Sequence, residues 1–174
     1  MIRNFNFNYI GEFDISSIAE KVKSLSDDDW NEFDYRQKKF PAHKETLTIP
    51  LLFDNDFDSY PIAYKFFNLF EEDVVKVHAF FSQFYKTGRF ARLILVKLLA
   101  NSEITPHYDQ GNSLNQGLRH HIPIITNDKV FFQISKDIKH LKQNEVWEIN
   151  NQRLHGVKNE SAEDRVHMIV DWII

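Results

Sequence analysis

The sequence predicts a mainly β protein with a helical flank, its core a barrel or a two-sheet jelly roll. Three observations support this: from Phe90 onward the chain breaks into short β-rich runs, clusters of Asn, Asp, Ser and Gly separate them, and no long helix intervenes. The 174 residues suit one domain, and 43% hydrophobic residues with 16 Phe supply its core. We expect a single domain over 1–174, with a mixed helical and strand flank over 1–89 and a jelly-roll core over 90–174.

The flank shows both the apolar–polar alternation of a strand and the apolar spacing of a helix. A first strand is predicted where apolar residues alternate with polar ones, at Phe5, Phe7 and Tyr9. A helix opens at Asp14 and is expected to stop at the Ser26–Asp29 cluster. Its apolar positions share one face: Ile15, Ile18, Val22 and Leu25. A second helix is expected over Asp73–Tyr85, where an apolar stripe indicates core packing, and Leu47–Phe53 resembles a strand.

The core strands follow from runs of β-branched and aromatic residues. They are expected at Arg92–Leu99, Leu118–Ile125, Val130–Ile134, Val146–Ile149 and Arg165–Ile174.

Charge and composition exclude several function classes. A net charge of −4 and a pI of about 6.0 argue against a nucleic-acid partner, which normally meets a basic surplus. The most apolar stretch, Phe90–Ala100, carries Arg92 and Lys97, so no membrane span is expected. The N-terminus shows no export signal, which makes the cytoplasm the default location. Because Cys is absent, a metal would have to be held by carboxylates and by some of the eight His.

Three residues form a candidate metal site. His107 and Asp109 are two positions apart, so in an extended chain they point to the same face and can reach one ion. His155 would come from a distant strand. Two imidazoles and one carboxylate make the facial triad of non-haem Fe(II) oxygenases, which leaves coordination positions open for catalysis.

Arg165 follows a turn-like segment, 159–164, after the strand of His155. We expect a hairpin that brings Arg165 back alongside that strand. An inward guanidinium needs an anion, and the distal carboxylate of a dicarboxylate co-substrate would provide one. The alternative is a surface pair with a nearby acid, namely Glu160, Glu163 or Asp164.

The blocks around these residues resemble the aspartyl/asparaginyl β-hydroxylase family of Fe(II)/2-oxoglutarate-dependent oxygenases, which also includes free-proline hydroxylases. The resemblance covers roughly Phe90–Trp172 and rests on the order and spacing of five segments. These are Pro106–Asp109, Arg119–Ile124, Trp147–Asn150, Arg153–Asn159 and Arg165–Asp171. With the strand pattern, it favours a double-stranded β-helix, the cupin-like jelly roll, as the core.

The resemblance implies roles residue by residue. Its iron ligands are His107, Asp109 and His155. Arg165 would grip the far carboxylate of 2-oxoglutarate, and His121 would also contact this co-substrate. Arg119 shares a strand face with His121 and would meet a carboxylate of the substrate. The implied activity uses Fe(II), 2-oxoglutarate and O₂ to hydroxylate an amino acid or an amino-acid residue.

Other histidines are less informative. His120 should point away from the site, and His167 either lines it or is a hydrogen-bonded core residue. His78 and His140 indicate nothing. Two departures from relatives stand out. Asp109 is present, whereas mammalian-type aspartyl β-hydroxylases lack this carboxylate ligand, so the chain is more similar to the small bacterial and phage-like members. Asn144 stands where relatives often have a turn Gly, and Asn tolerates the left-handed backbone.

The resemblance implies that the substrate is an amino acid or a peptide, and the short chain favours a small one. Candidate cleft residues in the flank are Trp30, Arg36, Gln37 and His43, although ordinary surface positions are the commoner outcome. The alternative function is a non-catalytic cupin-like module that holds a metal or a small acid. The presence of both Arg165 and His121 favours the oxygenase over the binding module, because a module that only binds a metal needs neither residue. The oligomeric state cannot be inferred.

Overall fold

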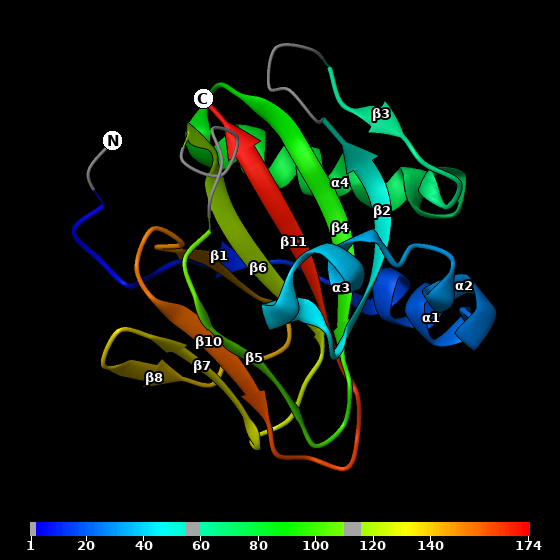
Figure 1. Ribbon diagram of the computed structural model, residues 1–174. Helices are drawn as coiled ribbons and strands as arrows, with labels where there is room; N and C mark the ends of the chain where they lie inside the picture. Colours follow the sequence, from blue (N-terminus) through cyan, green and yellow to red (C-terminus); the bar gives the residue numbers. More distant parts are fainter. Residues whose placement is uncertain (1–2, 55–59, 110–115) are drawn as a thin grey trace.

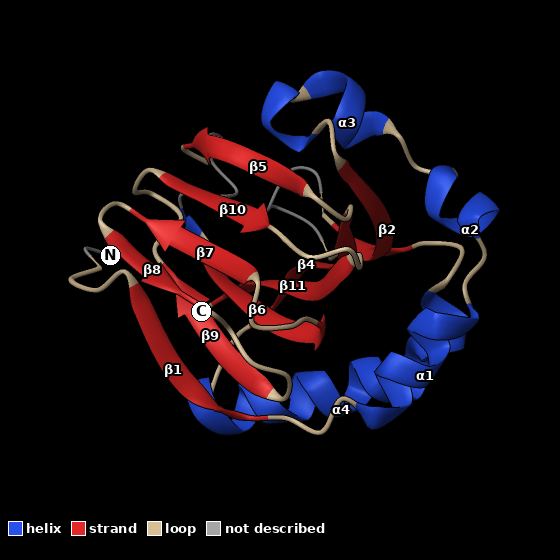
Figure 2. Cartoon of the chain, turned by 90° about the horizontal axis from the view of Figure 1, so that it is seen from below, coloured by secondary structure: helices blue, strands red, loops and turns tan. Residues whose placement is uncertain are grey.

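Two antiparallel β-sheets face each other, and helices cover the outer side of the larger sheet (Figures 1 and 2). The computed structural model describes residues 3–54, 60–109 and 116–174. Within these residues the larger sheet has the order β1-β9-β6-β11-β4-β2-β3, and the smaller has the order β5-β10-β7-β8. This arrangement confirms the predicted jelly-roll fold.

The strands of the core lie close to their predicted positions. The larger sheet contains β1 (Phe7–Glu12), β9 (Glu145–Ile149), β6 (Leu118–Ile125), β11 (Arg165–Ile173), β4 (Arg89–Leu98), β2 (Thr46–Phe53) and β3 (Ile62–Ala63). The smaller contains β5 (Ser102–His107), β10 (His155–Asn159), β7 (Val130–Ile134) and β8 (Asp137–Lys139). The short β8 has no sequence signal of its own. Asn144 has φ 67°, the left-handed conformation expected of it.

The helices belong to the N-terminal half. They are α1 (Ser16–Ser24), α2 (Asp27–Asn31), α3 (Tyr35–Lys39), the 3₁₀ turn η1 (Pro41–His43) and α4 (Phe67–Tyr85). The predicted stop at Ser26–Asp29 is only half right, because Ser26 also caps α2 through a reciprocal pair with Asp29. The helix α4 starts six residues before the predicted Asp73. Among the described residues, no helix is long and apolar enough to cross a membrane.

The larger sheet buries a different kind of residue on each face. On β11 the even-numbered residues, such as Met168 and Trp172, pack in the core beneath α1 and α4. The odd-numbered ones, such as Arg165 and Asp171, face the space between the sheets together with alternate residues of β6. A strand period of two therefore separates an apolar outer face from an inner face rich in buried polar groups.

The prediction of a hairpin before Arg165 is wrong. The strand of His155, β10, pairs with β5 and β7 in the smaller sheet, whereas β11 pairs with β4 and β6 in the larger one. The connection crosses between sheets and is tied by Asn159, whose Nδ2 donates to the carbonyls of Leu99 and Glu163 at 3.0 and 2.8 Å. Arg165 and His155 consequently lie in opposite sheets instead of side by side in one hairpin.

The N-terminal half is more than a flank. Its strands β1 and β2 extend the larger sheet on both sides, pairing with β9 and β4 respectively. The turn of α3 and η1 closes the open end between the sheets (Figure 2). The first half of the chain thus completes the walls around the site.

Candidate active site

The strands β5 and β10 bring two histidines together. His107 and His155 are direct cross-strand partners, and their ring centroids lie 4.4 Å apart. Gly156 permits this approach, because a Cβ at that position would stand 2.8 Å from the carbonyl oxygen of Ile104. The small residue after His155 therefore lets the two strands pack closely where the ligands emerge.

Hydrogen bonds fix the orientation of both rings. The Nδ1 of His107 lies 2.8 Å from the carbonyl oxygen of Thr105, and the Nδ1 of His155 lies 2.9 Å from that of Arg153. A carbonyl oxygen only accepts, so in each ring Nδ1 carries the hydrogen and Nε2 keeps its lone pair. Backbone partners of this kind orient metal-binding imidazoles.

Asp109 completes the group. Its Oδ1 lies 3.7 Å from Nε2 of His107, and its Oδ2 lies 3.9 Å from Nε2 of His155. One ligand atom from each of the three residues falls within 4.8 Å of the others. The carboxylate is held by Asn151, whose Nδ2 donates to Oδ2 at 3.1 Å and whose carbonyl accepts from the backbone N–H of Asp109. The donor set matches the facial triad of a non-haem iron site.

Arg119 lies between two carboxylates. Its Nε and Nη2 donate to the two oxygens of Asp171, each at 2.8 Å, and its Nη1 donates to Asp109. Burial by itself would raise the pKa of Asp109, but the charge of Arg119, together with His155, the Asn151 hydrogen bond and His107, outweighs it and lowers this pKa to about 2. Asp109 is therefore an anion at any pH at which the protein would act.

A second arginine supports Asp171 from β4. The Nη1 of Arg92 lies 3.7 Å from Oδ2 of Asp171, and its guanidinium stacks 4.7 Å over the ring of Phe53. Asp171 thus anchors two guanidinium groups on the inner face of the larger sheet. Neither Asp171 nor Arg92 was singled out from the sequence, because their meaning depends on strands that pair far apart in the chain.

A buried polar cluster lies deeper between the sheets. Arg165 is 1% exposed, and its Nη2 contacts Nδ1 of His167, which lies 3.3 Å from Nδ1 of His121. Among the described residues Arg165 has no carboxylate partner, and its Nε has no hydrogen-bond partner. Burial lowers the pKa of Arg165 to about 9, so the group is still a cation near neutral pH. Burial, followed by Arg165, also holds the pKa values of His121 and His167 well below 6.5.

Phe132 of β7 connects this cluster to the triad of His107, Asp109 and His155. Its ring makes an edge contact with His121 at 5.0 Å and stacks on His155 at 6.3 Å between centroids. The predicted residues of both groups thus share one interior. By contrast, His120 lies on the outer face of β6, where its Nε2 contacts the hydroxyl of Tyr85 at 2.6 Å.

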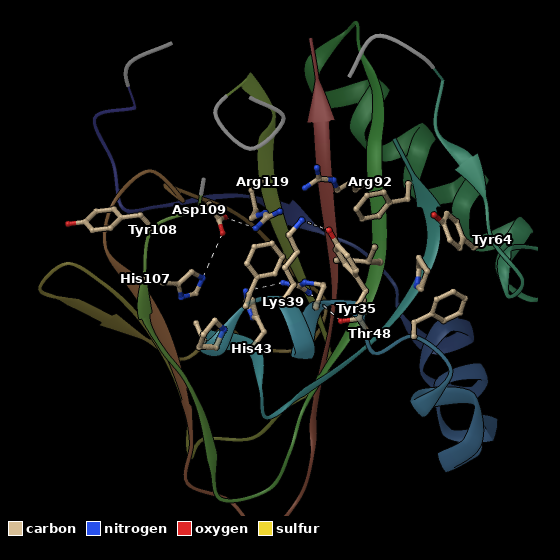
Figure 3. A pocket seen from close by; sticks show the side chains of 18 residues that line it. Tyr35, Lys39, His43, Thr48, Tyr64, Arg92, His107, Tyr108, Asp109 and Arg119 are labelled. Atoms are coloured by element: carbon tan, nitrogen blue, oxygen red, sulfur yellow. Dashed lines mark hydrogen bonds and ion pairs between the residues drawn. The ribbon is translucent and has the colours of Figure 1, made fainter. Parts of the chain in front are cut away.

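A cavity of about 800 Å³ opens beside the triad (Figure 3). His107 and Asp109 lie at one end and Tyr64 at the other, with Arg119 and Arg92 on the wall between them. Of the four candidate cleft residues in the flank, Arg36 and His43 line this cavity. Trp30 is instead a core residue, 1% exposed, and Gln37 is absent from the wall.

The sequence of the chain matches the aspartyl/asparaginyl β-hydroxylase family over residues 16–173. The chain belongs to this family. The match extends through the N-terminal half, well beyond the region Phe90–Trp172 on which the resemblance was based. This β-hydroxylase family member is accordingly placed among the oxidoreductases, and no curated protein sequence matches it.

Solved structures show the same fold at low sequence identity. The viral collagen prolyl hydroxylase vCPH of Paramecium bursaria Chlorella virus 1, in complex with 2-oxoglutarate, shares 9% identity with a TM-score of 0.58, covering 98% of each chain. AviO1 from Streptomyces viridochromogenes shares 12% identity with a TM-score of 0.57, covering 97% of this chain and 90% of that one.

A third similar structure is an oxidoreductase of the 2-oxoglutarate–Fe(II) oxygenase family from Burkholderia pseudomallei. It shares 13% identity with a TM-score of 0.56, over 74% of this chain. The matched region spans 66% of the Burkholderia chain, just under two thirds of its length. These structures share the fold of the chain, and the family match points to a β-hydroxylase.

Proposed function

We propose that this protein is an Fe(II)- and 2-oxoglutarate-dependent dioxygenase that hydroxylates an amino acid or an amino-acid residue. The observation that carries the proposal is the orientation of the triad. Two imidazoles with hydrogen-bonded Nδ1 atoms present their Nε2 lone pairs to one another and to Asp109, with all three ligand atoms within 4.8 Å.

The donor set fits iron. His107, Asp109 and His155 would hold the metal through two nitrogens and one oxygen, and the other coordination positions would be open to ligands. When bound, Fe(II) would activate O₂ for C–H hydroxylation, with 2-oxoglutarate as the two-electron reductant that leaves as succinate and CO₂. The chain supplies the fixed orientation of its ligands and, on one side of them, the buried cluster of Arg165, His121 and His167.

The buried cluster fits a dicarboxylate. Arg165 is a cation with an unpaired Nε and no acid beside it in the described chain, and an unpaired buried charge is costly. A distal carboxylate of 2-oxoglutarate would neutralise Arg165 through paired N–H donors. His121 and His167 are held neutral beside it, so their ring N–H groups can orient the same ligand without adding charge.

Arg119 supports the metal ligand and lies on the wall of the cavity. Its guanidinium has five N–H donors, and three of them are used on Asp171 and Asp109. We retain its proposed contact with a substrate carboxylate, because its remaining donors are available to the cavity. The partner is then a small molecule or peptide, with no nucleic acid or membrane involved.

The proposal predicts succinate formation from 2-oxoglutarate that requires His155. Purified protein with Fe(II), 2-oxoglutarate and air should release succinate, and a panel of amino acids and peptides should include compounds that stimulate this release. The variant His155→Ala should lose at least about 100-fold of the activity, because it lacks a metal ligand. The measurement is succinate and product mass by mass spectrometry.

His78→Ala is the matched control. His78 is an exposed residue of the outer helix α4, so this variant should keep the activity. Succinate release that survives in His155→Ala would contradict the proposal. So would tight binding of Zn²⁺ or Ni²⁺ with no succinate release under any condition, a result that favours the non-catalytic binding module.

A further inference from the structure

The cavity beside the triad has room for a ligand larger than a free amino acid. Its volume of about 800 Å³ lies in the range of sites for drug-sized ligands, roughly 300–1,000 Å³. Much of its wall is apolar and aromatic, with contributions from Phe33, Phe53 and Tyr64 around the far end. The wall therefore offers a long apolar surface that starts at His107 and ends at Tyr64 (Figure 3).

The charged groups on this wall are mostly cations. Four basic side chains line the cavity, namely Arg36, Lys39, Arg92 and Arg119, whereas its acidic lining among the described residues is Asp109 alone. Asp109 is also a proposed metal ligand, so a bound divalent ion would offset its charge. An anion is consequently favoured over a cation in this space.

Two of these arginines are already bound to acids. Arg119 bridges Asp109 and Asp171, and Arg92 lies within 3.7 Å of Asp171. Arg36, on the short helix α3, differs from both. Its Nη1 donates to the hydroxyl of Thr48 at 3.3 Å, and its Nη2 donates to Nε2 of His43 at 3.3 Å.

Both partners of Arg36 are uncharged. His43 accepts at Nε2 and is neutral, because burial and then Arg36 lower its pKa to about 2. In the parts of the chain that are described, no carboxylate comes within ion-pair distance of Arg36. Arg36 is thus a positive group on the cavity wall that is held by two neutral contacts.

Arg36 also stands next to the metal ligands. Its neighbour His43 makes an edge contact with the ring of His107, with 5.0 Å between centroids. A ligand whose anionic end binds Arg36 would therefore place its adjacent atoms beside the triad and its remainder against the aromatic wall.

We propose that Arg36 binds the carboxylate of an organic acid that has an apolar or aromatic body and is larger than a free amino acid. A guanidinium fork matches a planar carboxylate with two parallel N–H donors. Arg36 is then a specificity-determining residue of the cavity. That the bound acid is a substrate rests on the proposed oxygenase function, whereas the binding of the acid by Arg36 does not.

The test compares acids with their uncharged amides. The probes are 4-phenylbutanoate and N-acetyl-L-phenylalanine, each with its primary amide, titrated calorimetrically into metal-free protein at pH 7.5. In the unmodified protein each acid should bind about tenfold more tightly than its amide, because a charge-assisted pair replaces a neutral one. In Arg36→Gln this preference should fall below about threefold.

Two further variants separate the guanidinium of Arg36 from positive charge in general. Lys38→Gln removes a cation from the same helix, but Lys38 is 74% exposed and lies outside the cavity wall, so the preference should persist. Arg36→Lys keeps the charge without the fork and should retain an intermediate preference. If no acid binds more tightly than its amide, or if the preference survives Arg36→Gln, the assignment is wrong.

The role of Arg36 and the proposed oxygenase function can fail independently of each other. Calorimetry needs neither iron nor O₂, so an Arg36-dependent preference without succinate formation would contradict only the oxygenase. Succinate formation without that preference would contradict only the role of Arg36.

Discussion

Charges alternate from the triad into the larger sheet, in the order Asp109, Arg119, Asp171 and Arg92. Asp171 is the residue on which this order depends, because it accepts from both guanidinium groups. Without it, the described partner of Arg119 would be Asp109 alone, the carboxylate proposed to bind the metal. The role of Asp171 is one of positioning, since it acts on the metal ligand through Arg119.

Asp171→Asn tests that role. The variant should lower Zn²⁺ or Mn²⁺ affinity about 10- to 100-fold, because the freed donors of Arg119 compete with the metal for Asp109. It should also reduce the free energy of unfolding by about 3–5 kcal/mol, the usual effect of breaking a buried ion pair. Metal titration and urea unfolding measure the two effects.

Glu160→Gln is the control for Asp171→Asn. It breaks the exposed pair with Lys158, so it should change neither quantity measurably. Unchanged metal affinity in Asp171→Asn would show that Arg119 holds Asp109 without help from Asp171.

At the scale of the elements, the metal site depends on how closely β5 and β10 approach. His107 and His155 can face one another because Gly156 leaves room for the backbone of β5. The register also shifts here, because Thr105 and Pro106 of β5 stand opposite Gly156 alone, which places the bulge in β5.

Gly156→Ala should therefore weaken the metal site. The added Cβ would meet the carbonyl oxygen of Ile104 at 2.8 Å and the backbone of Pro106 at 3.2 Å, so β5 must move away. We expect metal affinity to fall at least about tenfold, with a loss of stability of about 1–3 kcal/mol. Isothermal titration with Zn²⁺ and thermal unfolding measure these changes.

Ala42→Gly provides a contrast to Gly156→Ala, since it changes the backbone freedom of the nearby turn η1 without adding an atom. It should lower stability slightly and leave the metal affinity within about threefold. Equal metal affinity in Gly156→Ala and the unmodified chain would mean that β5 tolerates the displacement.

At the scale of the whole molecule, the fold keeps an unusual number of histidines buried and uncharged. Burial lowers the pKa of His43 to about 2 and that of His120 to about 3, and it holds those of His121 and His167 well below 6.5. In the unfolded chain each would titrate near pH 6.5.

The free energy of unfolding should therefore fall as the pH drops below about 6.5. In that range the unfolded chain takes up protons that the folded chain excludes, so acid favours unfolding. The loss approaches about 1.4 kcal/mol per pH unit for each such histidine and continues until the folded pKa is reached. Urea unfolding at pH 7.0, 6.0 and 5.0 measures the slope.

His120→Gln isolates one contribution to this slope. His120 lies on the outer face, away from the triad, so the variant should flatten the dependence by up to about 1.4 kcal/mol per pH unit. A free energy of unfolding that does not change between pH 7.0 and 5.0 would contradict the burial of neutral histidines.

Local sequence patterns determined the class of fold and predicted the three candidate metal ligands. The i, i+2 spacing of His107 and Asp109 and the period of β6, which separates Arg119 and His121 from His120, are properties of an extended chain that need no tertiary information. The positions of β6 and β7 were predicted to the residue for the same reason. The extent of the single domain stays a prediction, although β1 and β2 extend the same sheet as the core strands.

The tertiary structure alone decided which residues meet. The sequence suggested a hairpin for 159–164, but pairing with β4 and β6 moved Arg165 to the opposite sheet from His155. Likewise, the partnership of Arg119 with Asp171 and the placement of Arg36 and His43 beside the triad link segments far apart in the chain. Periodicity specifies the face on which a side chain lies, whereas its neighbour across the interior depends on long-range strand pairing and sheet packing.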